Sequence, residues 1–256
     1  MNISPEMSPE LLSHEGKPVF ADSPETGDNR LKIEFAGFDH EKAPINESEI
    51  KDKVAWLKDG LDKEDLQPGL VETLISKIEY NPVQVEIDEK YGLEGNGAPH
   101  KAAAYCYFME GKIVFYDAVA SCKSFNYILA HEFGHLVATQ TMTEPARATY
   151  LAKRADLLAQ GKIQDTRYVA GMNEDLKDGE RLAEDFALLM TDQKMNRELS
   201  QALKEAIRSN SAEQTKINLQ ASIERAKNIP DQDKRFEDSS LMGSLEYPRK
   251  KKPGEI

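Results

Sequence analysis

Hydrophobic side chains recur at two different spacings along the chain. Their helical spacing predicts helices over about residues 50–60 and 66–78, and Pro68 is acceptable because it falls in the first turn of the second helix. Residues 82–87 instead alternate between apolar and polar side chains, which is typical of a half-buried strand. A glycine-rich loop at 91–99 follows, so the folded part begins with helices and then turns to a small sheet.

The central part of the chain predicts a β-hairpin that leads into a long helix. The apolar segments 103–109 and 112–116 are separated by Glu110-Gly111, which is a good hairpin signal. The pattern over residues 124–141 then predicts a single helix. This order of elements indicates an α+β fold that is mostly helical, with a small mixed sheet or hairpin packed against the helix at 124–141.

Helical patterns continue to about residue 229. Pro145 stands where a new helix is expected to begin, and residues 146–160 form an Ala- and Leu-rich helix that should stop at Gly161. A further helix is expected at about 178–191, and one or two amphipathic helices complete the domain.

We expect one folded domain at 46–229 between polar, disordered tails at 1–45 and 230–256. Residues 31–35 alternate and predict either a strand or a docking peptide. The N-terminal tail has either no specific role or that of an uncleaved export signal, as injected bacterial effectors carry. The basic run at 249–252 is interpreted as a solvated tail, with membrane-surface or nuclear targeting less favoured.

Charge and composition exclude several classes of protein. The net charge of −12 argues against nonspecific nucleic-acid binding, and no apolar run has the length of a transmembrane helix. The N-terminus lacks the parts of a cleavable secretory signal, so we expect a cytoplasmic protein or one secreted without such a signal, including into a host cell. Cys106 and Cys122 are too few for a disulfide framework or a structural zinc cluster, which favours reduced thiols.

The helix at 124–141 carries the sequence His131-Glu132-Phe133-Gly134-His135. Positions four apart lie on one face of a helix, so His131 and His135 can direct their imidazoles at one point, as a zinc ligand pair requires. Glu132 lies about 100° further round the helix, where it can reach a water on the metal without being a ligand. This His-Glu-x-x-His pattern predicts one catalytic Zn²⁺ and a general base.

Two observations argue against a chance match. The chain has only five histidines, and two of them take these spacings around a glutamate. The histidines also lie off the apolar face of the helix. Their side of the helix carries mostly small residues, whereas the apolar residues lie on the other side: Tyr127, Gly134 and Ala138 share the histidine side, and Phe125, Leu129, Phe133 and Leu136 lie opposite.

A catalytic zinc needs a third protein ligand. His14 and His40 belong to the predicted tail, His100 lies in a loop upstream, and no histidine follows His135, which favours a carboxylate. The helix near 180 repeats the pattern of the first, because Glu180 and Glu184 share a side with small residues. Glu180 is the predicted ligand. Glu184 is expected to accept the other ring N–H of a ligand histidine, with Asp185 as second choice for that role.

These two helices together resemble the gluzincin branch of the zincin metallopeptidases. The stretch with Glu180, Ala183, Glu184, Phe186 and Leu189-Met190 is similar to the third-ligand helix of the anthrax lethal factor-like catalytic domains, and the interval of about 45 residues after His135 suits that group. The repressor-cleaving metallopeptidases of the ImmA/IrrE type have a related helix, typically after a shorter interval. The resemblance covers about a quarter of the chain.

The resemblance implies a zincin-like hydrolase domain in which His131, His135 and Glu180 hold zinc and Glu132 is the catalytic base. Lethal factor-like domains place a tyrosine about two turns before the glutamate ligand, where it helps to stabilise the oxyanion. Asn173 stands in that neighbourhood here. Tyr168, upstream of it, is therefore expected to supply this donor, with Tyr150 less favoured.

Three functions compete at this point. The first is a zinc-dependent endopeptidase that acts on a protein substrate, as a secreted or injected bacterial effector or toxin. The second is an intracellular regulatory metallopeptidase that cleaves a repressor, and the third is a zincin-fold binding protein without activity, against which the intact Glu132 argues. We expect the substrate to lie extended along a sheet edge. Residues 103–107 or 112–116 would form this wall of the cleft, and the second segment is preferred because it runs directly into the metal helix.

Overall fold

The computed structural model describes residues 32–83, 86–87, 100–101, 103–122, 124–170 and 174–227, and the structural statements below concern these residues. The helices are α1 (Glu47–Lys63), α2 (Leu70–Leu74), α3 (Phe125–Gln140), α4 (Glu144–Ala159), α5 (Arg167–Ala170), α6 (Glu174–Met190), α7 (Arg197–Ile207) and α8 (Ala212–Ala226). The strands are β1 (Glu34–Ala36), β2 (Lys77–Asn81), β3 (Glu86–Ile87), β4 (His100–Lys101), β5 (Ala104–Tyr107) and β6 (Lys112–Tyr116), and a 3₁₀ turn at Asp117–Ser121 joins β6 to α3. The predicted α+β fold, mostly helical with a small mixed sheet, is confirmed.

Four strands form a mixed sheet in the order β1-β2-β6-β5. β1, β2 and β6 are parallel, and β5 is antiparallel to β6, as the predicted hairpin requires. Gly111 in the hairpin turn has a φ of 63°, and a Cβ there would lie 2.4 Å from the Leu74 carbonyl oxygen, so glycine is needed at this position. β6 lies inside the sheet with both edges paired. The preference for residues 112–116 as a substrate-binding edge is therefore wrong, whereas β5 stands at the edge.

The predicted helix at 66–78 and strand at 82–87 are also wrong in their bounds. The helix is limited to α2, and Lys77–Asn81 form the strand β2; of the predicted strand, residues 82–83 are not in a strand and Glu86–Ile87 form β3. The apolar residues at 74, 75 and 78 fit a helical period, but Ile78 and Tyr80 alternate as buried residues of β2. Parallel pairing of β2 with β6 over five residues outweighs the local pattern, because strand formation depends on partners distant in sequence.

The N-terminal boundary of the domain also differs from the prediction at residue 46. Glu34–Ala36 forms β1 and pairs in parallel with β2, which supports the strand interpretation of that segment. α1 begins after a capping box made by Asn46 and Glu49, and it continues through Gly60 to Lys63 rather than ending at the glycine. The sheet therefore begins before the first helix.

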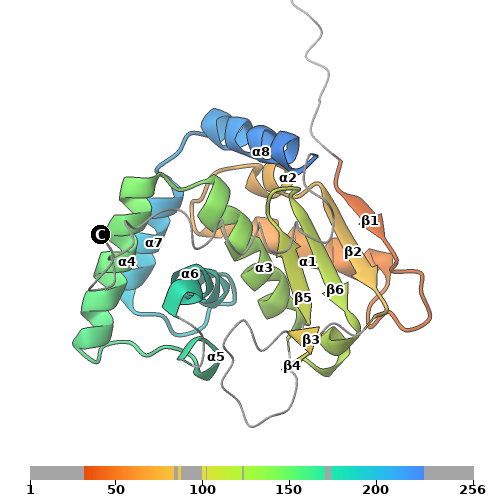
Figure 1. Ribbon diagram of the computed structural model, residues 1–256, viewed down its shortest axis with the longest axis horizontal. Coiled ribbons are helices and arrows are strands. Elements are labelled where there is room, and N and C mark those ends of the chain that lie inside the picture. Colours follow the sequence, from red (N-terminus) through yellow and green to blue (C-terminus); the bar gives the residue numbers. More distant parts are fainter. Residues whose placement is uncertain are drawn as a thin grey trace, which may run out of the picture. The chain divides into compact units, whose positions relative to one another are not determined.

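Helix α3 lies at the centre of the fold, between the sheet and α6 (Figure 1). Ser124 caps its first turn by accepting a hydrogen bond from the backbone N–H of Tyr127. The Phe115 and Phe125 rings, with centroids 4.5 Å apart, pack the start of α3 on β6. Five apolar side chains from its middle turns are fully buried, as expected for a helix covered on both sides: Leu129, Ala130, Phe133, Leu136 and Val137.

Helices α3 and α6 approach closely. Tyr127 contacts Glu184, whereas His131, one turn later in α3, contacts Glu180, one turn earlier in α6. At Gly134 the approach is so close that a Cβ would lie 2.9 Å from the Ala183 Cα and 3.1 Å from its carbonyl oxygen. Glycine at 134 therefore lets the two backbones meet, which the small residues on this face of α3 had indicated.

Replacing Gly134 with alanine should push α3 and α6 apart. We expect a cost of about 1–3 kcal/mol from overpacking, against a gain of at most about 1 kcal/mol from better helix propensity. The free energy of unfolding should therefore fall, which urea denaturation measures. Gly60→Ala is the matched control in α1, because its Cβ would meet only the Met190 Sδ at an ordinary 3.5 Å. An unchanged or higher urea midpoint for Gly134→Ala would contradict the packing described here.

Candidate metal centre

The α3–α6 contact brings the three predicted ligands together. Nε2 of His131 lies 3.2 Å from Oε2 of Glu180, and Nε2 of His135 lies 3.7 Å from Oε1 of the same carboxylate. One donor atom from each of the three residues lies within 4.8 Å of the others. Two imidazole nitrogens from α3 and one carboxylate from α6 thus converge on a single point.

The spacing of these atoms suits a tetrahedral zinc ion. Zn–N and Zn–O bonds of about 2.0–2.1 Å at tetrahedral angles place ligand atoms about 3.3 Å apart, close to the 3.2 Å from His131 to one Glu180 oxygen and the 3.7 Å from His135 to the other. The Oε2 atom of Glu180 is buried and receives no hydrogen bond of good geometry. A buried carboxylate oxygen without a donor is costly, and a cation would satisfy it. The donor set and its surroundings therefore fit zinc.

The pKa values of these groups show how strongly the cluster is desolvated. Burial acts to lower the pKa of His131, but contact with the Glu180 carboxylate outweighs it and raises the value to about 9. Burial lowers the pKa of His135 to about 4. Burial acts to raise the pKa of Glu180, yet the two histidines lower it below its usual value. The Glu180 carboxylate and the His131 ring therefore attract each other, and a metal ion bound here would compete with protons for both.

Glu132 is buried beside the cluster. Burial is the main cause that raises its pKa to about 7, whereas His131 acts to lower it and Glu180 to raise it. A hydrogen bond from the backbone N–H of Cys106, in β5, also acts to lower this pKa by stabilising the charged carboxylate. A carboxylate with a pKa near neutrality is well matched to accept and return a proton at physiological pH.

The backbone of Cys106 is a part of the site that the sequence did not reveal. A main-chain N–H carries no residue signature, and only the position of the hairpin before the metal helix hinted that β5 would lie close to Glu132. The side chain of Cys106 packs in the core, and Cys106 and Cys122 do not form a disulfide with each other.

Glu184 lies one turn beyond Glu180, and its hydrogen bond comes from the Tyr127 hydroxyl. Burial and this carboxylate both raise the pKa of Tyr127. Glu184 is close enough to His131 for its charge to raise the pKa of that histidine, while its hydrogen bond to a ligand ring N–H stays a prediction. The role of Tyr127 was missed, although its position on the histidine face of α3 was the available signal.

Other predicted residues lie away from the cluster. Tyr150 is buried and donates its hydroxyl to Asp185, so the minor expectation that Tyr150 stabilises an oxyanion is wrong. Asp185 also accepts from Arg154 on the α4 side of α6, which rules out the outer-shell role considered for it. The backbone of Tyr168 belongs to α5, but its side chain lies outside the described part of the structure. His40 is exposed, and the side chain of His100 is not described.

Comparison with known proteins gives no match: no protein-family model, no curated protein and no solved structure is significantly similar to this chain. The assignment of the site therefore rests on the residues and their geometry. Among the described residues, no helix is both long and apolar enough to cross a membrane.

The cluster should bind zinc at one ion per chain. We expect zinc at about 100 times its Kd to stabilise the fold by about 2.7 kcal/mol, because only the folded chain presents the three donors together. Thermal unfolding with and without zinc measures this shift, and plasma emission spectrometry gives the metal content. His135→Ala and Glu180→Gln should lose both effects, whereas His40→Ala, at an exposed histidine outside the cluster, should keep them. Zinc stabilisation that survives in Glu180→Gln would contradict the ligand assignment.

Proposed function

We propose that the protein is a zinc-dependent endopeptidase that hydrolyses a peptide bond in a protein substrate. The observation that carries this proposal is the convergence of His131, His135 and Glu180 next to a buried Glu132. Two histidines and a carboxylate leave a fourth zinc position for water or substrate, which is the arrangement of catalytic rather than structural zinc sites.

In the proposed mechanism, three residues bind the metal ion and a fourth transfers protons. His131, His135 and Glu180 would hold the ion, which, when bound, lowers the pKa of water and polarises a carbonyl group. Glu132 takes the proton from the attacking water and returns it to the leaving amine. The hydrogen bond from the Cys106 N–H fixes the Glu132 carboxylate at the β5 side of the site. Burial of Glu132 keeps its pKa high enough for both proton transfers.

The outer edge of β5 is the surface we propose for the substrate backbone. The N–H of Tyr116 donates to the Ala103 carbonyl oxygen, and antiparallel ladders alternate, so the main-chain groups of Ala104 and Cys106 point away from β6. The bond from Cys106 to Glu132 agrees with this register. No strand pairs with this edge among the described residues. An extended peptide added here would lie beside Glu132, as strand addition requires.

Glu132→Gln should abolish hydrolysis and leave zinc binding intact. General acid–base catalysis contributes about 10²–10⁴ in rate, and the amide cannot accept the proton. We would incubate a cell lysate with zinc-loaded wild type or variant and profile the new protein N-termini by mass spectrometry. Glu205→Gln, at an exposed carboxylate in α7, is the control and should cleave like the wild type.

The expected outcome is a set of cleavage sites that appears with wild type and control and is absent with Glu132→Gln. The same N-termini from wild type and Glu132→Gln, both with one zinc per chain, would show that the site binds metal without peptidase activity and would refute the proposed function.

A further inference from the structure

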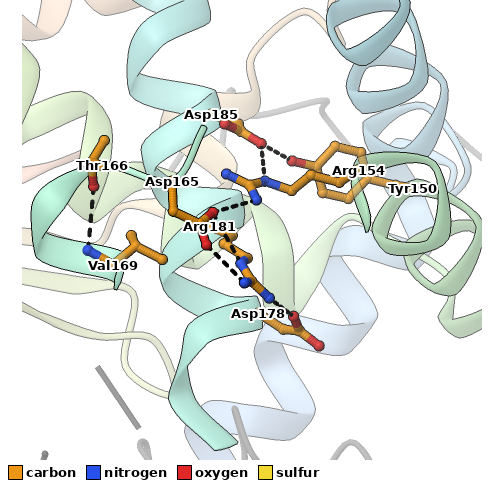
Figure 2. Close-up of polar contacts among 8 residues, drawn as sticks. All are labelled: Tyr150, Arg154, Asp165, Thr166, Val169, Asp178, Arg181 and Asp185. Carbon is orange, nitrogen blue, oxygen red and sulfur yellow. Dashed lines mark hydrogen bonds and ion pairs between the residues drawn. The ribbon is translucent and has the colours of Figure 1, made fainter. Parts of the chain in front are cut away.

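An ion-pair network joins α6 to α4 on a side of α6 next to that of Glu180, and two of its members, Arg154 and Asp185, are buried (Figure 2). Arg154 of α4 donates from Nε to Asp185 at 2.7 Å and from Nη1 to Asp165 at 2.6 Å. Arg181 of α6 donates to both oxygens of Asp165, at 2.8 Å and 3.2 Å. Asp165, in the segment between α4 and α5, is thus held by two guanidinium groups.

Each residue of α6 that belongs to the metal site is followed directly by a residue of the ion-pair network. Glu180 and Glu184 face α3, while Arg181 and Asp185 each follow one position later, about 100° round the helix. The helix is therefore fixed from two sides, by α3 through the cluster and by α4 through the network. Tyr150 and Asp178 complete the second side, by bonds to Asp185 and Arg181.

Such a network is better suited to fixing an arrangement than to adding stability. The side chains of Arg154 and Asp185 are only 4% and 5% exposed, so the attraction between them is offset by the cost of removing both from water. Buried ion pairs of this kind specify one geometry, since any other leaves a charge unpaired. Here the bonds to Arg154 and Asp165 fix the rotational position of α6 about its own axis.

A zinc site is sensitive to this rotation. Side-chain tips lie about 5–6 Å from a helix axis, so a rotation of about 20° moves the Glu180 carboxylate by about 2 Å. Metal sites tolerate only about 0.2 Å in ligand distance. Packing of apolar residues alone permits small rotations, whereas the forked bonds from Arg181 to Asp165 do not.

We propose that the network of Arg154, Asp165, Arg181 and Asp185 is a positioning device for the metal centre, which sets the rotation of α6 so that Glu180 meets His131 and His135. This inference rests on the proposed zinc site. Asp165 is its key positioning residue, because it alone joins both arginines and lies outside α6 and α4.

Asp165→Asn tests the inference in the full-length protein. The variant removes the charge shared by the two arginines, but Arg154 keeps Asp185 and Arg181 keeps Asp178, so the fold should be retained. We expect the zinc Kd, measured by chelator competition, to rise about 10–100-fold, the range typical for loss of a residue that orients metal ligands. The visible absorption spectrum of the Co²⁺-loaded variant should change as well, since it reports ligand geometry.

Ile113→Val in β6 is the control, because it removes one methylene from the core outside α6 and so weakens the fold without touching the network. It should keep the wild-type Kd and Co²⁺ spectrum. If Asp165→Asn fails to fold, Arg181→Lys takes its place: it keeps the charge and loses the forked contact with Asp165, so it should raise the Kd too.

An Asp165→Asn or Arg181→Lys protein that folds and binds zinc with wild-type Kd and spectrum would overturn the positioning role while the metal site stands. A similar loss of affinity in Ile113→Val would also overturn it, because general destabilisation would then explain the effect. Absence of zinc binding by the wild type would instead refute the proposed function, and this inference with it.

Discussion

The close contact between α3 and α6 at Gly134 is the constraint on which the rest of the site depends. The two histidines come from one helix and the carboxylate from the other, so their distance is set by how near the two backbones can come. With the Cβ position of Gly134 only 2.9 Å from the Ala183 Cα, no larger residue fits there without moving a helix. The 3.2 Å and 3.7 Å separations of the donor atoms follow from this approach.

The same contact creates an electrostatic problem that a metal ion would resolve. It buries Glu132 of α3 and Glu184 of α6 and leaves the Glu180 side chain only 17% exposed, in a region where charged groups are costly. The chain relieves part of this cost through Tyr127 on Glu184 and the Cys106 N–H on Glu132. Among the described residues, the two histidines offset the charge of Glu180, and a divalent cation placed among them would balance the remaining charge.

The sequence predicted the parts of the site that depend on local helical geometry. The faces of α3 and α6 follow from 100° per residue, so the convergence of His131, His135 and Glu180 and the small-residue contact could be anticipated. Features that depend on partners distant in sequence could not. The pairing of β2 with β6 made the last residues of a predicted helix part of a strand, and the sheet order placed the strand expected to bind substrate inside the sheet. Likewise, the sequence offered Tyr150 and Asp185 for roles at the metal site. In the folded chain Asp185 instead accepts hydrogen bonds from Tyr150 and Arg154.

The ligand assignment is tested most directly by the X-ray absorption spectrum of the zinc-loaded protein at the zinc edge. Two histidines and one carboxylate with a fourth oxygen ligand predict a single shell of nitrogen and oxygen at about 2.0–2.1 Å, with the outer-shell scattering of two imidazole rings. A sulfur shell at about 2.3 Å, from Cys106 or Cys122, or an oxygen shell without imidazole scattering would contradict the zinc site described here.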